Sequence, residues 1–481
     1  MSTILALSLP STIDGLTHDE QAEYQRLAQV WQATAPRNSL RMSYYLGHNR
    51  LKDLDISIPP SLKHTETVVG WPAKAVDMLA ARSMFDGFVS SKDQENLFGL
   101  PEILEANQFD AAYDQAVRSQ LIHCTAFWTV TPGDDSAGEP KVLIALRSAE
   151  FAAALWDFRL RRIRSGLAIV DMSADNPAVP TELNLYFDEH TIVARKLSNN
   201  QWKAERLTNV LGRPAMEPMP FQPDYLRPFG RSRITREVMS ITDSGQRAAL
   251  REEVLMEFNT APQKAILGAE ESAFDEKRWK TYMSSMLAIT RDEDGQLPTL
   301  MQLPQLSPQG AIQYMQHLAM RFAGATSIPV SSLGVIQDNP ASAEAIFAAK
   351  DDLVATAHTL NRYNRISLVT VAKMALAVND NIRFADIPTE YQTLQARFRN
   401  PAMPSVVSQS DGMVKQISAI PWLAETDVAL EELGYDESQI MRLLDQKRKA
   451  EAGSVLDRIL ESRKAPTVTV DMDRGREPEE V

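Results

Sequence analysis

The sequence predicts an α+β fold that is mainly helical, with one region of antiparallel sheet and a long helix behind an apolar loop. Apolar residues recur at helical spacing through most of the chain, but they alternate with polar residues between about positions 121 and 207. From Ala341 to Ala377 the chain contains neither proline nor glycine. At about 1.5 Å per residue this stretch would form a helix of about 55 Å, which suggests an element that spans a large assembly.

The first 120 residues are predicted to be mostly helical. Tyr24, Leu27, Ala28 and Trp31 recur on one helical face, which is typical of a helix packed on a core. The predicted helices are Asp19–Trp31, a short helix closing at Tyr44–Gly47, a third through Ala75–Ala80, and Glu105–Gln120.

After Leu121 the alternation predicts strands separated by turn-forming clusters such as Pro132–Asp135 and Ser198–Asn200. Ala149–Trp156 is predicted to be a short helical insertion among them. The region therefore combines helices with an antiparallel sheet. The predicted strands are Cys124–Thr131, Lys141–Leu146, Leu160–Met172, Glu182–Phe187, Thr191–Leu197 and Gln201–Leu207.

A proline-rich connector, Gly212–Gly230, leads into a predicted stalk with a tip. Ser232 is the expected N-cap of a helix near 232–258, and Gly245 within it is the expected place of a bend. A second helix is predicted near 309–323. The mixed insert between them is predicted to hold a helix at Phe274–Tyr282, a strand at Met286–Thr290, an acidic turn at 292–295 and an extended Leu300–Leu306.

The loop Gly324–Pro340 separates the second stalk helix from the long helix. It contains two glycines and two prolines but no Lys or Arg. Pro340, preceded by Asp338 and Asn339, is a strong helix start.

The C-terminal region begins after an exit segment, Asp386–Arg399, that is predicted to contain a strand. Asn400-Pro401 and Pro404 mark a boundary. Three helices are expected at Ser408–Ile420, Glu425–Leu433 and Asp436–Leu460, and the charged residues after 462 are expected to be disordered.

The length, composition and net charge of the chain limit which classes of protein it can belong to. The 481 residues, 44% of them hydrophobic, suffice for two or more domains, and a single cysteine excludes a disulfide framework within the chain. No apolar run is long enough for a membrane span, and the N-terminus lacks the pattern of a signal peptide, so a soluble intracellular protein is expected. The net charge of −13 argues against gripping nucleic acid through its phosphates. It does not argue against a surface that DNA slides past.

Catalytic, cofactor-binding and metal-binding residues are not predicted. The chain lacks the phosphate-binding loop, the dinucleotide fingerprint, the zinc-protease and nucleophile-elbow motifs, and the two-cysteine redox motif. Asp292–Gly295 resembles part of a calcium loop, but a solvated hairpin turn is favoured. The seven histidines are scattered and are interpreted as packing or surface residues.

One basic cluster stands out: Arg159, Arg161, Arg162 and Arg164. A phosphate-binding stripe would need these side chains on one face, whereas alternation along a strand splits them between two. Ion pairs between subunits, or a solvated edge, are therefore favoured.

The chain resembles the portal proteins of tailed bacteriophages, most closely those of long-tailed phages that infect Gram-positive, often actinobacterial, hosts. The resemblance runs from about residue 44 to 450, and the matching motifs occur in one order. They are VGWPAKAVDMLAAR at 69–82, PFGRSRITR at 228–236, AITRDEDG at 288–295, AGATSIPVSSLG at 323–334, DNPASAEAI at 338–346 and IPWLAETD at 420–427.

The resemblance implies a ring, usually of twelve copies, at one capsid vertex, assembled in the host cytoplasm and carried in the virion. Double-stranded DNA would pass through its channel. The implied partners are the terminase large subunit, the major capsid and scaffolding proteins, and a head–tail adaptor, with no cofactor, no enzymatic activity and no membrane. The implied regions are the wing (1–231 and 344–399), stem helices (232–258 and 309–323), the clip (259–308), the tunnel loop (324–343), the crown (400–462) and a disordered tail (463–481).

The implied site residues follow the same regions. Trp279 and Tyr282 in the clip are candidates for docking the packaging motor or the adaptor, although packing within the clip explains aromatic residues equally well. The channel-loop candidates are Ile328, Val330, Ser331, Ser332, Leu333, Val335, Ile336, Gln337 and Asn339. Two alternatives remain open: a nuclease or terminase subunit of the packaging machinery, and a generic oligomeric scaffold.

Overall fold

A computed structural model describes most of the chain. The described residues are 7–50, 67–93, 96–134, 136, 138–260, 264–267, 299–302, 307–335, 350–402, 406–435 and 439–450. The chain divides into two compact units, Met1–Pro401 and Ala402–Val481.

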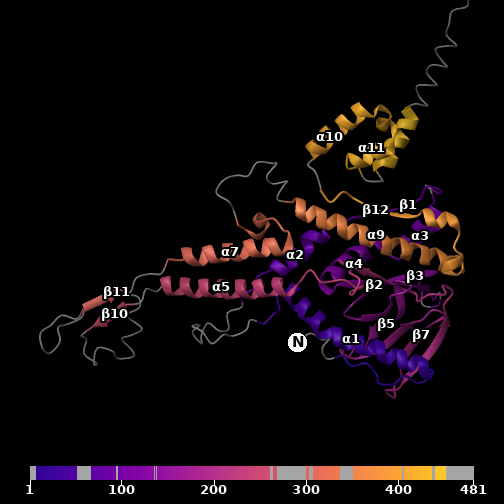
Figure 1. Cartoon of the computed structure of the whole chain (residues 1–481), viewed down its shortest axis with the longest axis horizontal. Helices are drawn as coiled ribbons and strands as arrows, with labels where there is room; N and C mark the ends of the chain where they lie inside the picture. Colours follow the sequence, from indigo (N-terminus) through magenta and orange to yellow (C-terminus); the bar gives the residue numbers. More distant parts are fainter. Residues whose placement is uncertain are drawn as a thin grey trace, which may run out of the picture. The chain divides into compact units, whose positions relative to one another are not determined.

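A five-stranded antiparallel sheet with the order β4-β5-β6-β7-β8 forms one layer of the first unit (Figure 1). Helix α1 (His18–Tyr45) packs against it, with Leu27 and Trp31 buried beside Leu167 and Ile192 of the sheet. The strands are β4 (Ala152–Asp157), β5 (Arg162–Met172), β6 (Pro180–Tyr186), β7 (His190–Lys196) and β8 (Trp202–Thr208).

Two helical predictions in this layer are wrong. Ala152–Asp157 is strand β4, paired with β5, and not part of a helical insertion. Its alanines are buried on both faces, Ala153 in the core beneath α1 and Ala152 and Ala154 in the main core, so the strand lacks the alternation that marks one solvated face. The two short helices predicted before residue 47 are one helix, α1, which begins at a capping box between Thr17 and Glu20 and contains Pro36.

A second antiparallel sheet has the order β3-β2-β9, formed by β3 (Val142–Ser148), β2 (Thr125–Pro132) and β9 (Met216–Pro220). Strand β9 comes from the proline-rich connector and was not predicted. Its Pro218 and Pro220 are tolerated because β9 is an edge strand, where a missing N–H breaks few ladder hydrogen bonds.

Helices α4 (Phe109–His123) and α9 (Asp351–Asn379) pack on this sheet, and α2 (Trp71–Ala80) and α3 (Leu100–Ala106) adjoin them. The helix predicted at 105–120 is in fact split at Gln108, whose φ of 48° breaks it into α3 and α4. The long helix is confirmed from Asp351 onward, and its predicted first part, before residue 350, lies outside the described residues.

A buried polar network ties α9 to α4. Asn364 accepts a hydrogen bond from Gln120 at 2.7 Å and donates one to the Tyr113 hydroxyl at 3.1 Å. Farther along, β12 (Gln395–Phe398) pairs with β1 (Phe85–Val89), which confirms the strand expected in the exit segment. Short 3-10 turns lie at Leu97–Gly99, Phe384–Asp386 and Thr389–Thr393.

The predicted stalk is two helices lying side by side, α5 (Arg236–Thr260) and α7 (Gln309–Thr326) (Figure 1). Strand β10 (Lys264–Leu267) follows α5 and pairs antiparallel with β11 (Thr299–Gln302), which precedes α7. The helix, strand and acidic turn predicted between 274 and 295 lie outside the described residues.

The second unit is helical in its described part. It contains α10 (Val406–Ala419), a 3-10 turn η9 (Pro421–Glu425), α11 (Asp427–Glu432) and helical residues 439–450. These elements match the helices expected there, and residues 451–481 lie outside the described part.

Candidate functional site at the root of the stalk

A buried arginine joins the stalk to the body of the first unit. Arg233 is 8% exposed and lies just before α5. Its Nε donates to the Ala75 carbonyl at 2.7 Å, and a terminal nitrogen donates to the Thr326 carbonyl at 2.5 Å. Its backbone N–H donates to Leu121 O at 2.8 Å. One residue therefore holds α2, the end of α4 and the end of α7 together.

The charge of Arg233 persists in this site. Burial lowers the pKa of the guanidinium to about 10, so the group stays protonated at neutral pH. Because main-chain carbonyls are its hydrogen-bond acceptors, it satisfies their lone pairs where water cannot reach. The sequence places Arg233 within the 228–236 motif, but spacing alone gives no sign of which carbonyls it would meet.

The start of α5 differs from prediction. Thr235, not Ser232, acts as the cap: its Oγ1 accepts from the Val238 N–H at 3.2 Å. Ser232 is buried instead, and its hydroxyl donates to the Ile122 carbonyl at 2.6 Å. The chain from Ser232 to Ile234 therefore docks against the end of α4 before α5 begins.

Trp71 wedges between the two stalk helices. Its ring lies 5.4 Å from the Phe322 ring of α7. On the other side, a Cβ at Gly245 of α5 would lie 3.1 Å from the Trp71 ring and 3.6 Å from Val69. Gly245 was expected to mark a bend, but α5 runs through it, and its lack of a side chain lets the indole pack against the helix.

The loop after α7 begins inside the core. Ser327 ends the helix with a left-handed φ of 54°, and Ile328 is 3% exposed within the main hydrophobic core. A short 3-10 turn, η6 (Val330–Leu333), follows, and Gly334 has a φ of 85°. Ile328 thus anchors the loop in the body, and its side chain is not available to a channel.

The other loop candidates differ in exposure. Ser331 is exposed, and Val330, Ser332, Leu333 and Val335 are half-buried. Ile336, Gln337 and Asn339 lie outside the described residues, as do the clip candidates Trp279 and Tyr282.

The exposed face of α7 carries little charge. Between Gln309 and Thr326, Arg321 is the one Lys, Arg, Asp or Glu. Arg321 is exposed, and the other exposed side chains of the helix include Ile312, Gln313, Tyr314, Gln316, His317 and Met320. Such a face offers contact area without a fixed array of cations for phosphates.

The arginine cluster does not form a phosphate stripe. Arg164 makes a 2.7 Å ion pair with Glu23 of α1, and Arg162 makes one of 3.3 Å with Asp188. Arg159 and Arg161 are exposed at the β4–β5 turn. Two of the four guanidiniums are therefore paired within the chain, whereas the sequence favoured ion pairs between subunits or a solvated edge.

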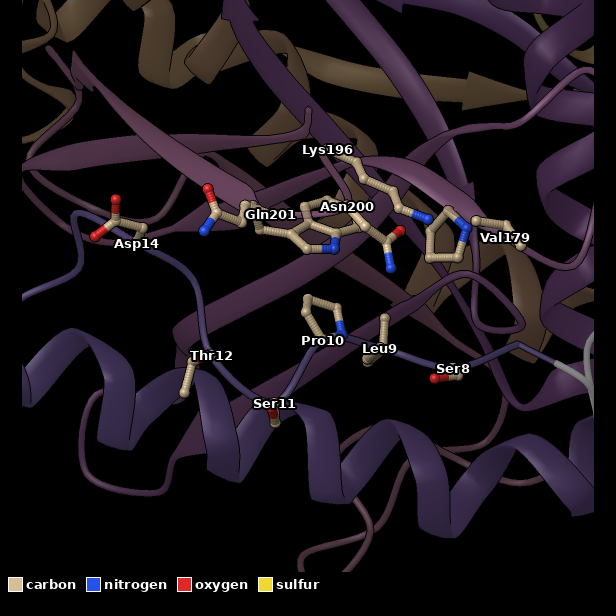
Figure 2. A pocket seen from close by; sticks show the side chains of 12 residues that line it. Ser8, Leu9, Pro10, Ser11, Thr12, Asp14, Val179, Lys196, Asn200 and Gln201 are labelled. Carbon is tan, nitrogen blue, oxygen red and sulfur yellow. The ribbon is translucent and has the colours of Figure 1, made fainter. Parts of the chain in front are cut away.

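A surface cavity of about 470 Å³ lies between the N-terminal segment and the β7–β8 turn (Figure 2). Asp14 and Lys196 are the charged groups among its lining residues. Within the ranges that the structure describes, no group of three His, Cys, Asp or Glu residues could hold a metal, and no helix is long and apolar enough to cross a membrane.

Comparison with known proteins gives two curated relatives over most of the chain. The chain is 23% identical over 418 residues to the portal protein of Mycobacterium phage L5, which covers 85% of both chains. It is 23% identical over 419 residues to the portal protein of Mycobacterium phage D29, again with 85% of both covered. No family model matches the sequence.

Solved structures give a weaker likeness. A chain from a gene transfer agent virion aligns with a TM-score of 0.43 and 11% identity, over 79% of this chain and 95% of that one. A chain from the neck of an empty particle, computed with C6 symmetry, aligns with a TM-score of 0.45 and 10% identity, over 73% and 86%. Both TM-scores are below 0.5, so sequence similarity is what identifies the relatives.

Proposed function

We propose that this chain, which is similar to the portal proteins of mycobacteriophages L5 and D29 along 85% of its length, is the portal protein of a tailed double-stranded DNA phage. The observation that carries the proposal is that the similarity extends over 85% of each relative as well, and so is not confined to one domain. In this function twelve copies form a ring at one capsid vertex. DNA enters and leaves through the channel.

The regions are assigned as follows. Residues 1–231 and 344–399 form the wing, and 400–462 form the crown. The stem is 232–258 with 309–323, and the paired helices α5 and α7 support that assignment. Strands β10 and β11, near the two ends of residues 259–308, pair antiparallel, and this supports the assignment of that segment as the clip. Residues 324–343 form the tunnel loop.

A channel for moving DNA requires weak contact, since each phosphate neutralised by Lys or Arg adds salt-dependent affinity. The nearly uncharged exposed face of α7 and the exposed Ser331 support a channel-facing role for α7 and the loop. The side chain of Ile328 is excluded from that role because it lies in the core.

The other binding partners follow from the proposed portal function. The terminase large subunit, and later a head–tail adaptor, would dock on the clip, with Trp279 and Tyr282 as candidate anchors. The major capsid and scaffolding proteins would surround the wing, and the assembled ring would become part of the virion.

Ring formation tests the proposal. Light scattering after size exclusion should give a mass many times 53.7 kDa, and negative-stain images should show a ring with a central hole. Assembly is measured both alone and with the cognate capsid and scaffolding proteins. A compact monomer under all of these conditions contradicts the proposal.

The enzyme alternative has its own test. A terminase or nuclease subunit should turn over ATP or cut DNA. We expect neither activity to co-purify with the ring, because the chain lacks a phosphate-binding loop. Turnover that follows this chain through purification, and that a point substitution in it abolishes, would favour the enzyme.

A further inference from the structure

Two neighbouring turns of the first unit expose large apolar side chains. One is the β4–β5 turn at 157–161, and the other, at 224–227, lies between β9 and α5. The exposed apolar side chains, two in each turn, are Phe158, Leu160, Tyr225 and Leu226. Tyr225 and Leu226 are 81% and 80% exposed, and the Phe158 and Tyr225 rings have their centres 6.1 Å apart. We name residues 157–161 and 224–227 the paired turns. Apolar side chains gathered in this way mark an interaction surface.

An aspartate fixes the backbone of each turn. Asp157 Oδ1 accepts hydrogen bonds from the backbone N–H groups two and three residues further on, at 2.8 and 2.9 Å. Asp224 Oδ1 accepts the equivalent pair in its own turn, at 3.0 and 2.9 Å. Such bonds hold a turn in one conformation. The apolar side chains are therefore displayed on a preformed backbone, which lowers the entropic cost of binding a partner.

The paired turns carry positive charge in excess. Arg159, Arg161 and Arg227 are exposed, and none of them forms an ion pair within the part of the chain that the structure describes. Asp224 is already paired with Arg231 at 2.6 Å. Arg161 also has a φ of 52°, a left-handed position that favours Gly or Asn, so an arginine is kept there at a conformational cost. This surface is thus positive on a chain whose net charge is −13.

A surface cavity of about 580 Å³ adjoins the paired turns, because Phe158 is one of its lining residues. Val30 of α1 and Trp156 of β4 contribute to its apolar lining. Its charged lining residues are Arg26 and Arg164. The surface therefore combines a hollow that can take apolar side chains with arginines that can take carboxylates.

We propose that the paired turns and this cavity dock an acidic segment of another protein that also carries apolar side chains. Charge complementarity identifies the occupant: its carboxylates meet Arg159, Arg161 and Arg227. Its apolar side chains cover Phe158 and Tyr225 and fill the cavity. Tyr and Arg are among the residues that dominate the energy of protein interfaces. The proposal rests on the proposed function, because in a portal this partner is a capsid or scaffolding protein that surrounds the wing.

A second copy of this chain fits this surface less well. The cavity beside the paired turns has arginines as its charged groups, and the cavity of Figure 2 has Asp14 offset by Lys196. Neither cavity offers an acidic hollow to Tyr225 and Leu226. Nucleic acid also fits less well, because phosphates would pair with the arginines but leave the apolar cavity in water.

Two double variants remove the two kinds of contact separately. Tyr225→Ser with Leu226→Ser removes apolar side chains, and Arg159→Glu with Arg161→Glu reverses charge. All four side chains are exposed, so stability and ring assembly should stay at the parent level. On co-expression with the cognate capsid and scaffolding proteins, the fraction of capsids that hold a ring should fall about tenfold for each double variant.

The matched control is Arg365→Glu with Ile366→Ser, which changes one charged and one apolar side chain exposed on α9. It should keep the parent values for ring assembly and for the fraction of capsids that hold a ring. A parent-level fraction in both double variants of the paired turns contradicts the proposal. Loss of ring assembly in those variants, with stability retained, shows that the surface binds another copy, and this also contradicts it.

Photocrosslinking identifies the occupant directly. In a Cys124→Ser background, Leu226→Cys is labelled with a benzophenone maleimide, and capsids that contain the labelled rings are irradiated. The expected adduct joins this chain to a different protein, through a peptide that carries more Asp and Glu than Lys and Arg. Ile366→Cys, labelled in the same way, should not link to that peptide.

The other crosslinking outcomes overturn the proposal. An adduct between two copies of this chain, or an adduct with DNA, assigns the surface to a different occupant. Rings that enter capsids without giving an adduct contradict the docking surface and leave the proposed function standing. Failure of the Cys124→Ser parent to form rings contradicts the proposed function, and the capsid partner with it.

Discussion

The Arg213 guanidinium donates a hydrogen bond of 2.6 Å to the Glu217 carboxylate, four residues along the chain. Both side chains are largely buried, and the guanidinium lies 4.7 Å from the centre of the Phe384 ring. Despite the ion pair, burial raises the pKa of Glu217 to about 7. Removal of the carboxylate from water therefore outweighs its attraction to Arg213.

This pKa gives a pH dependence with a definite sign. Between about pH 4.5 and 7 the folded chain binds the Glu217 proton more tightly than the unfolded chain does. The free energy of unfolding should therefore fall as pH rises through this window, and this contribution should level off above about pH 7. Glu217→Gln should flatten this part of the profile, measured as urea midpoints. Parallel profiles for parent and variant would contradict the assignment.

Arg233→Met should lower the free energy of unfolding by about 3 kcal/mol, because it leaves the Ala75 and Thr326 carbonyls buried without their donor. Arg233→Lys should recover only part of the loss, since one ammonium lacks the fork that reaches both carbonyls. Hydrogen exchange at residues 324–335 should accelerate in both variants. The control is Arg231→Met, an exposed neighbour paired with Asp224, which should cost less than about 1 kcal/mol.

Gly245→Leu should destabilise the stalk root by about 1–3 kcal/mol, because the new side chain meets the Trp71 ring. Adding Trp71→Ala should make the two effects less than additive, since the second change removes the clash. Urea midpoints of the parent, the two single variants and the double variant measure the coupling. Gly324→Ala on α7 is the matched control: nothing lies within 4 Å of its added methyl group, so it should be neutral or stabilising.

Ser331→Lys should leave ring assembly unchanged and reduce the DNA packaged per head. One added cation per copy would place a ring of charge against the phosphates, and higher salt should relieve the defect. Thr12→Lys, at an exposed site on the N-terminal segment, is the control. Packaging at the parent level by Ser331→Lys rings over a range of salt would show that this residue does not face DNA.

Much of the secondary structure follows from periodicity. The amphipathic stripe of α1, the alternation of β5 to β8 and the proline-free stretch of α9 all predict their elements. The failures have physical causes. Ala152–Ala154 favours helix locally, but pairing with β5 and burial on both faces of the strand decide otherwise. Pro218 and Pro220 disguise β9, because proline is compatible with a strand only at an edge.

The site was less predictable than the fold. Ile328 belongs to an apolar loop sequence, and only the tertiary structure shows that its side chain fills the core. Arginine is usually a surface residue, so the sequence gives no reason to place Arg233 inside the protein. Its burial is compensated by hydrogen bonds to two carbonyls that are distant in sequence. Such contacts are long-range, so no local pattern encodes them.

The node at Arg233 has a mechanical consequence. A force along the stalk reaches Thr326 at the end of α7, and the guanidinium links that residue directly to Ala75 of α2. With Ile328 and Pro329 also buried, the backbone up to residue 329 is clamped. Load carried along α7 therefore reaches the body through Thr326 and Arg233 and need not pass through residues 330–335. In the proposed ring, the force of packaging would be borne by these buried contacts and not by the exposed Ser331.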